Sequence, residues 1–343
     1  MSADSLHVAI VGGASLKGRE LADVLTARSF PAHDVRLLDD DESLGQLGAV
    51  GNEATFVQSV GPEQFEHVDV AFFASDEAFT RRNWHLAREA GAGIVDLSYG
   101  LESQARVAVR APWIERELGR PQALELQPAP IVVAHPAAVV LALLLLRIQR
   151  VGPVRSAAAT VIEPASERGR GGMDELHEQT VSLLSFRELP KQVFKAQVAF
   201  NMISSYGEGA APAMAAVERR IAGHFGQIVS GIVPPPALLL LQGPSFHGHT
   251  FALYAEMERR AEIGDLLHSL GAEHVSVVHG PAESPSNVNA AGQDEILLTV
   301  RPDSQRENGF WLWAAADNLR LTALNAAECA DIMAAARPKG KVQ

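Results

Sequence analysis

The sequence predicts an α/β protein with a doubly wound dinucleotide-binding domain followed by a mixed α+β domain. Three observations support this prediction. The chain has 343 residues, enough for two domains that each bury a core. It opens with an apolar run, a glycine turn, a helical pattern and further apolar runs, the order found in a doubly wound sheet. Its second half contains a run in which apolar and polar residues alternate, as in a half-solvated antiparallel strand.

The first half contains the short apolar runs that parallel strands show when both faces of their sheet are covered. His7–Val11 predicts a first strand that ends in Gly12-Gly13, and Lys17–Ala27 predicts a helix with one apolar face. The other expected elements are strands at Val35–Leu38, Val68–Ala74, Gly93–Asp96 and Ile131–Ala134, and helices at Phe79–Ala90 and Ala137–Gln149.

The second half predicts a smaller set of elements. Ser156–Glu163 is an apolar strand, and a polar helix starts near Met173. Phe251–Glu258 alternates in polarity, and we expect Ile296–Val300 to pair with it. Phe310–Ala336, rich in Ala and Leu, predicts a long terminal helix.

Composition excludes several classes of function. The chain has 29 Lys and Arg against 41 Asp and Glu, a formal charge of -12, which argues against nucleic acid as a partner. The single cysteine, Cys329, excludes an internal disulfide and a thiolate metal cluster. Met1–His7 lacks the basic start of a secretory signal, and prolines interrupt the uncharged stretch Gln127–Leu146. We therefore expect a cytoplasmic protein without a membrane span.

The glycine turn is a candidate phosphate-binding loop. A tight turn, close backbone approach and a helix N-terminus can together hold a pyrophosphate. Serine replaces the middle glycine of the usual pattern, so a strand-to-helix turn that binds nothing remains an alternative. The candidate cofactor contacts are Gly12, Gly13, Ala14, Ser15 and Gly18.

Four acidic residues, Asp39 to Glu42, follow the second strand. An acid at this place accepts hydrogen bonds from the adenosine ribose hydroxyls, whereas several acids oppose the 2′-phosphate of NADP. The sequence predicts NAD rather than NADP through Asp39, with a solvated acidic turn as the alternative.

Eight segments, in order along nearly the whole chain, resemble the aspartate-semialdehyde dehydrogenase family. They are VAIVGGASLKGREL from Val8, DVAFFAS from Asp69, AREAGAGIVDLS from Ala87, IVVAHPAAVV from Ile131, ERGRGGMDELHEQT from Glu167, VAFNMI from Val198, GHTFALY from Gly248 and ADNLRLTALNA from Ala316. The resemblance implies a dinucleotide-binding domain over residues 1–133 and a dimerisation and catalytic-like domain over 134–315. It also implies a C-terminal helix, 316–343, that packs back on the first domain, and a homodimer.

The resemblance also implies a lost nucleophile. The family places its reactive cysteine in an N-P-N-C-S-T turn, and His135-Pro136-Ala137-Ala138-Val139-Val140 corresponds to it here, so Ala138 takes the cysteine's place. A methyl group cannot form the covalent adduct that the phosphorylating reaction needs. The chain therefore resembles the Usg-type members, and Cys329, in the terminal helix, is expected to be a buried structural residue.

Other family positions differ as well. Glu163 replaces a glutamine, Gln242 replaces the arginine that grips the substrate carboxylate, and Glu102 replaces an arginine assigned to phosphate. His249 matches the catalytic histidine. Ser75 and Asn318 match positions that contact the cofactor.

Two functions follow from this pattern. The first is a dinucleotide-binding homodimer with a regulatory or structural role and an unknown small-molecule ligand. The alternative is an NAD(P)-dependent oxidoreductase acting on an aldehyde or oxo compound without a covalent step, with His249 and Glu163 as an acid–base pair. An inherited histidine whose hydrogen bonds are now structural is the simpler interpretation of His249.

Several further side chains have simpler interpretations. His135, His247 and His249 match no metal-ligand spacing, so we expect no metal. Arg168 and Arg170 are either an anion site or solvated surface residues. Trp311 and Trp313 are expected in the core or at an interface.

Overall fold

The protein is represented by a computed structural model that describes residues 6–50, 53–120, 129–278 and 284–336. Residues 1–5, 127–128 and 337–343, used above for the signal, membrane and terminal-helix expectations, lie outside this part. The chain divides into two compact units: unit 1 contains residues 1–134 and 322–343, and unit 2 contains His135–Leu321. None of the helices within the described ranges is long and apolar enough to cross a membrane.

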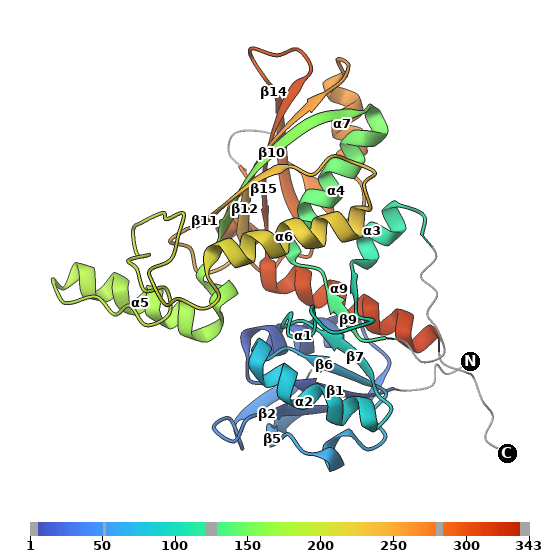
Figure 1. Cartoon of the computed structure of the whole chain (residues 1–343), viewed down its shortest axis with the longest axis vertical. Coiled ribbons are helices and arrows are strands. Elements are labelled where there is room, and N and C mark those ends of the chain that lie inside the picture. The colour runs from blue at the N-terminus through green and yellow to red at the C-terminus, as the bar shows by residue number, and fades with distance from the viewer. Residues whose placement is uncertain (1–5, 51–52, 121–128, 279–283, 337–343) are drawn as a thin grey trace. The chain divides into compact units, whose positions relative to one another are not determined.

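Unit 1 is built on a seven-stranded parallel sheet with the order β5-β2-β1-β6-β7-β9-β8 (Figure 1). Its strands are β1 Leu6–Val11, β2 Ala32–Asp39, β5 Gln58–Ser59, β6 Val70–Phe73, β7 Gly93–Asp96, β8 Ala108–Arg110 and β9 Ile131–Val133. Its helices include α1 Leu16–Ala27, α2 Glu77–Glu89 and α3 Pro112–Glu117, and β3 Leu47–Val50 and β4 Glu53–Phe56 form a hairpin. The parallel sheet confirms the predicted doubly wound domain.

The last part of helix α9 (Asn318–Ala335) belongs to unit 1 from Thr322 onwards. Its Glu328 carboxylate accepts a hydrogen bond from Trp113 Nε1 at 3.0 Å and forms ion pairs with Arg116 and Arg28. Cys329 beside it is fully buried. This polar cluster attaches the terminal helix to α1 and α3 through one carboxylate.

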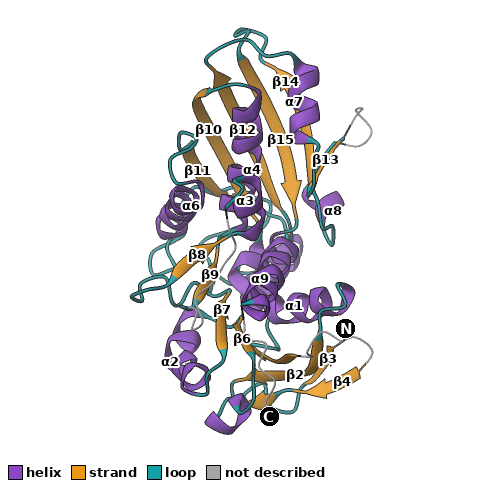
Figure 2. Cartoon of the chain, turned by 90° about the vertical axis from the view of Figure 1, so that its right-hand side faces the viewer, coloured by secondary structure: helices purple, strands orange, loops and turns teal. Residues whose placement is uncertain are grey.

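Unit 2 is built on a six-stranded mixed sheet with the order β11-β10-β12-β15-β14-β13 (Figure 2). Its strands are β10 Val154–Glu163, β11 Ala237–Gln242, β12 His249–Met257, β13 Val275–Val277, β14 Ile296–Pro302 and β15 Gly309–Ala316. Helices α4 Pro136–Val151, α6 Met214–Val229 and α7 Ile263–Leu270 contact these strands. This mixed sheet confirms the predicted second domain.

One face of the unit 2 sheet carries partly exposed side chains, and we call it the open face. On β12 the odd-numbered residues from His249 to Met257 are buried, whereas Ala252, Tyr254 and Glu256 are only partly buried. The register places Trp311 opposite Tyr254 and Trp313 opposite Ala252, so both tryptophans lie on the open face.

The expected helix Phe310–Ala336 is wrong in its first third. Residues Gly309–Ala316 form β15, and α9 begins only at Asn318. Aromatic residues favour strands, and the buried and exposed residues of Gly309–Ala316 alternate in part as on a half-covered sheet. Asp317 then accepts hydrogen bonds from the N–H groups of Leu319 and Arg320, as a helix-capping acid does.

The insertion of β15 also corrects a predicted strand pair. We expected Ile296–Val300 to pair with Phe251–Glu258, but β14 pairs with β15, and β15 separates it from β12. The error follows from assigning the intervening strand to a helix.

A helical arm, α5 Gly169–Leu184, projects from the unit 2 sheet and is followed by a long return loop (Figure 1). The buried Glu175 carboxylate accepts hydrogen bonds from the backbone N–H groups of Gln192, Val193 and Phe194. Gln179 Oε1 accepts from two more, Val198 and Ala199. Two side chains one helical turn apart therefore shape the return loop.

Candidate functional site

The candidate residues fall into a loop in unit 1 and a buried cluster in unit 2. In unit 1, β1 ends in Gly12, whose φ is +88°. A Cβ on Gly12 would overlap the backbone nitrogen of Ser75, and a Cβ on Gly18 would overlap the carbonyl oxygen of Gly12. These glycines are thus required by the packing of the turn, with or without a cofactor.

The loop uses most of its own N–H groups. Gly12 and Gly13 both donate to the carbonyl oxygen of Leu38, and Ala14 donates to the Asp39 carboxylate at 3.0 Å. Ser15 Oγ caps α1 by accepting from the Gly18 N–H at 2.9 Å. Serine at this position therefore acts as a helix cap.

Two backbone donors remain at the start of α1. Within the described ranges, the N–H groups of Leu16 and Lys17 donate to no acceptor. They belong to the first turn of a helix of 12 residues, where the helix dipole is positive. These N–H groups, rather than those of the glycines, could hold a phosphate of a dinucleotide.

Lys17 adds a cation that the sequence analysis missed. Its Nζ donates to the carbonyl oxygen of Leu97 at 3.0 Å and lies 4.5 Å from the centre of the Tyr99 ring. Leu97 directly follows β7, so the ammonium lies at the carboxyl ends of the strands. Ligands of doubly wound sheets bind at this edge. The motif alone gave no signal for Lys17, because its role depends on the loop after β7.

The four acids after β2 separate into one buried and three exposed residues. Asp39 is buried and also accepts from the Asp40 N–H at 3.0 Å, whereas Asp40, Asp41 and Glu42 are exposed. Burial raises the pKa of the Asp39 carboxyl, and its hydrogen bonds from Ala14 and Asp40 oppose this rise. Asp39 thus stabilises the glycine turn through its hydrogen bond from Ala14, while the three exposed acids make the neighbouring surface negatively charged.

In unit 2, the structure brings His249 and Glu163 onto neighbouring strands. Glu163 is the last residue of β10 and His249 is the first of β12. The antiparallel ladder ends at the pair Ile162 and Thr250, so Glu163 and His249 lie one step beyond it. Both are buried, with exposed fractions of 2% and 1%. The two members of the expected acid–base pair thus lie at adjoining ends of neighbouring strands.

A second acid, Glu167, also faces this histidine. Its Oε1 lies 4.0 Å from His249 Nε2 and accepts a hydrogen bond from Asn318 Nδ2 at 2.8 Å. Asn318 Oδ1 in turn accepts from Ser166 Oγ and from the Gly248 N–H. No sequence motif pointed to Glu167, and Asn318 as a cofactor contact stays a prediction.

The turn with Ala138 begins helix α4. His135 caps this helix: its Nδ1 accepts a hydrogen bond from the Ala137 N–H at 3.2 Å. The backbone N–H of His135 donates to His224 Nδ1 at 2.9 Å. Ala138 follows in the first turn and is fully buried. The rings of His135 and His249 have their centres 5.8 Å apart. Across the described residues, no three His, Cys, Asp or Glu side chains are grouped closely enough to hold a metal ion.

Gln242, which by the resemblance takes the place of the carboxylate-binding arginine, is hydrogen-bonded within its own chain. Its Nε2 donates to the carbonyl oxygens of Glu163 and Gly243, at 2.9 and 2.8 Å. Its Oε1 accepts from Tyr206 Oη at 2.9 Å. The amide is fully buried and already carries three hydrogen bonds. It cannot replace a guanidinium in binding a carboxylate.

Arg168 and Arg170 differ in their surroundings. The Arg168 guanidinium lies over the Tyr206 ring, 4.2 Å from its centre, and its Nη2 donates to the carbonyl oxygen of Pro212. Burial and the nearby Glu163 raise the pKa of the Tyr206 hydroxyl, and the Arg168 charge opposes this rise. Arg170 instead is exposed and pairs with Asp174 at 3.6 Å. Only Arg170 fits the solvated alternative.

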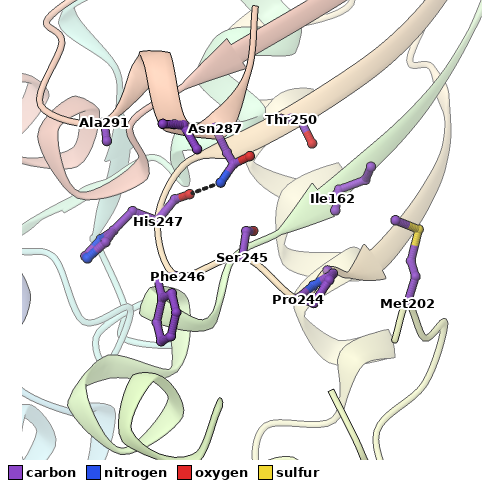
Figure 3. A pocket seen from close by; sticks show the side chains of 11 residues that line it. Ile162, Met202, Pro244, Ser245, Phe246, His247, Thr250, Asn287 and Ala291 are labelled. Atoms are coloured by element: carbon purple, nitrogen blue, oxygen red, sulfur yellow. Dashed lines mark hydrogen bonds between the residues drawn. The ribbon is translucent and has the colours of Figure 1, made fainter. Parts of the chain in front are cut away.

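A pocket of about 530 Å³ opens near the start of β12, on the side of the open face (Figure 3). It is lined by Ile162 and Thr250 of the sheet and by the exposed apolar side chains of Phe246, Met202 and Val288. Of the three histidines considered for a metal, His247 lines this pocket, whereas His135 and His249 are buried together in the cluster.

Comparison with known proteins identifies the family. Residues 7–124 match the model of the semialdehyde dehydrogenase NAD binding domain, and residues 145–321 match that of the semialdehyde dehydrogenase dimerisation domain. A USG-1 protein homolog of Pseudomonas aeruginosa is 31% identical over 94% of this chain and 95% of its own length. A second USG-1 protein homolog, from Azotobacter vinelandii, is 30% identical over 96% of this chain and 98% of its own.

Solved structures agree with these relatives. The structure of a probable aspartate-semialdehyde dehydrogenase from Pseudomonas aeruginosa superimposes with a TM-score of 0.85. It is 28% identical, over 96% of this chain and 98% of the other. The two domain models, the relatives and the fold agree along nearly the whole chain. The chain therefore belongs to the semialdehyde dehydrogenase family, as a Usg-type member.

Proposed function

We propose that the protein is a dinucleotide-binding homodimer that does not catalyse the phosphorylating dehydrogenase reaction. One observation carries this proposal: residue 138, which by resemblance takes the place of the nucleophile, is a fully buried alanine. A methyl group forms no thiohemiacetal, so hydride transfer has no covalent intermediate to start from. The amide of Gln242 supports the same conclusion, because it is already hydrogen-bonded to Tyr206 and Glu163 and offers no guanidinium to bind a carboxylate.

Cys329 does not replace the missing thiol in this proposal. It is fully buried in unit 1, and burial raises the pKa of its thiol well above the ordinary value. Because the thiolate is the reactive form, this cysteine is poorly suited to nucleophilic attack.

The cofactor of the proposed function is NAD rather than NADP. The NAD binding domain supports a dinucleotide, and the free N–H groups of Leu16 and Lys17 support a phosphate contact. The exposed acids Asp40, Asp41 and Glu42 oppose the additional 2′-phosphate of NADP.

A thermal-unfolding series with NAD, NADP and their reduced forms tests this choice. Ligand at one hundred times its Kd stabilises the folded state by about 2.7 kcal/mol, a readily measured shift. We expect a larger shift with NAD. In Asp41→Asn/Glu42→Gln the shift with NADP should increase, while the exposed pair Glu63→Gln/Glu66→Gln serves as a charge-matched control. A larger shift with NADP than with NAD in the unmodified protein would contradict the choice.

The proposed homodimer forms through the open face of the unit 2 sheet. Leu239 pairs with Thr160, which pairs with Ala252, so it lies on the open face with Trp311 and Trp313. All three side chains are exposed, and the match to a dimerisation domain spans them. Light scattering on purified protein is expected to give twice the chain mass. Leu239→Asp, at a side chain 48% exposed, should shift the protein towards monomer. Leu44→Asp, at a side chain 57% exposed in unit 1, is the matched control and should leave the mass unchanged.

The second candidate function is a non-covalent oxidoreductase reaction on an aldehyde or oxo compound. It is favoured by the buried imidazole of His249 with the Glu167 carboxylate 4.0 Å away, and by the buried Glu163 at the end of the neighbouring strand, groups suited to proton transfer. NADH oxidation with a panel of small aldehydes, comparing the unmodified protein with His249→Ala, tests it. Equal background rates in both proteins would reject this function and leave the binding role.

A further inference from the structure

Glu167 is a buried acid for which neither domain match nor motif provides a role. It lies in the short 3-10 helix Ala165–Arg168 that follows β10, and its side chain is 4% exposed. Its Oε1 is 4.0 Å from His249 Nε2. A carboxylate at this distance from an imidazole favours the protonated, positively charged form of the ring.

The position of this carboxylate is fixed by one amide. Asn318 Nδ2 donates to Glu167 Oε1 at 2.8 Å, and Asn318 Oδ1 accepts from Ser166 Oγ at 3.2 Å. The same Oδ1 accepts from the N–H of Gly248, the residue before His249, at 3.1 Å. Asn318 therefore ties the segment that carries the acid to the strand that carries the histidine.

The charges around His249 favour its protonated form. Glu167 faces it from the 3-10 helix, Glu163 ends the neighbouring strand β10, and the ring of His135, the cap of α4, lies 5.8 Å away. The fixed cation in this neighbourhood is Arg168, which lies on the Tyr206 ring near Glu163 and Glu167. An imidazolium at His249 would supply the Glu167 carboxylate with a nearby counter-charge inside this buried cluster. Buried charge without a counter-charge is costly.

We propose that Glu167 is a positioning residue that, held by Asn318, keeps His249 protonated at neutral pH. The imidazolium then offers a fixed N–H donor inside the buried cluster. This proposal deepens the second candidate function and rests on it for its use in catalysis, but its measurement needs no turnover.

An NMR titration of the histidines in the full-length protein tests the proposal. The chain has 12 histidines, and the His249 signal is assigned by its loss in His249→Gln. In the unmodified protein we expect a His249 pKa above the ordinary value of about 6.5. In Glu167→Gln, which retains an oxygen acceptor for Asn318 but removes the charge, the pKa should fall by about one to three pH units.

Glu178→Gln is the matched control, because it removes the same charge from an exposed position on α5. It should leave the His249 titration unchanged. A wild-type pKa below the ordinary value would overturn the proposal without any variant, as would equal His249 titrations in Glu167→Gln and Glu178→Gln. If Glu167→Gln fails to fold, Asn318→Ser takes its place, and an unchanged pKa there counts against the proposal.

The outcome is separable from that of the second candidate function. A raised pKa that depends on Glu167, together with no aldehyde reduction, supports the positioning role and rejects the reaction. Aldehyde reduction that requires His249, together with an unshifted His249 pKa, supports the reaction and rejects the positioning role of Glu167.

Discussion

Restoring a sulfur atom at residue 138 is the sharpest perturbation of the proposed function. Ala138→Cys places a thiol in the first turn of α4, where the helix dipole favours a thiolate. The alanine is fully buried, however, so the added atom must enter a filled space at a cost of about 1 to 3 kcal/mol of folding free energy. Ala137→Cys, at the preceding and equally buried position, is the matched control.

The turnover expected of Ala138→Cys can be estimated from the groups around residue 138 in unit 2. Loss of a covalent nucleophile lowers turnover about a millionfold, so its return recovers at most that factor, on the order of 8 kcal/mol. The substrate carboxylate would still meet the Gln242 amide, which is already committed to Tyr206, Glu163 and Gly243. A missing charged partner costs roughly 2 to 5 kcal/mol. The variant should therefore remain about 30- to 5,000-fold slower than an enzyme with an arginine at that position.

The assay follows reduction of NAD or NADP with aspartate semialdehyde and phosphate, and mass spectrometry of the protein detects a thioester. We expect no more than a slow formation of adduct in Ala138→Cys and none in Ala137→Cys. A rate equal to that of an aspartate-semialdehyde dehydrogenase would show that the Gln242 site is not limiting. That result would refute the reasoning.

Three further predictions concern buried groups. Cys329 should resist thiol reagents in the native protein and react only on unfolding, because burial raises its pKa and keeps the thiol protonated; fast native labelling would contradict this. Glu175→Ala leaves three backbone N–H groups without an acceptor, so it should lower the free energy of unfolding by about 3 kcal/mol or more, measured by urea denaturation. An effect no larger than that of the control Glu178→Ala would contradict this prediction. Glu328→Ala removes the acceptor of Trp113 and should cost about 2 kcal/mol, since its arginine partners are partly solvated; an unchanged midpoint would disprove this contribution.

The parallel sheet was predictable because its strands have a strong local signal. Gly93–Asp96, for example, is a short apolar run after a helix, and β7 has these same bounds. The segment Gly309–Ala316 was not predictable in the same way, because its alanines and leucine also suit a helix. Its strand conformation depends on pairing with β12 and β14, contacts between residues far apart in the sequence.

The cluster was predictable only in part. His249 and Glu163 could be named, because the resemblance gives their positions in the sequence; in the structure they stand at adjoining ends of β12 and β10. Glu167 could not, since its approach to His249 depends on Asn318, 151 residues further along the chain. The glycine loop shows the opposite problem. Its pattern suggested a phosphate site, yet Gly12 and Gly18 are explained by steric packing, and the unoccupied donors belong to the helix that follows.

The hydrogen bonds that Glu175 and Gln179 accept in the arm have a consequence for assembly. The return loop is hydrogen-bonded to side chains of its own chain, so most of its conformational entropy is lost when the chain folds rather than when another molecule binds. A second molecule that docks on the arm meets a rigid surface and needs little rearrangement. The loop therefore keeps its shape whether or not another molecule contacts it.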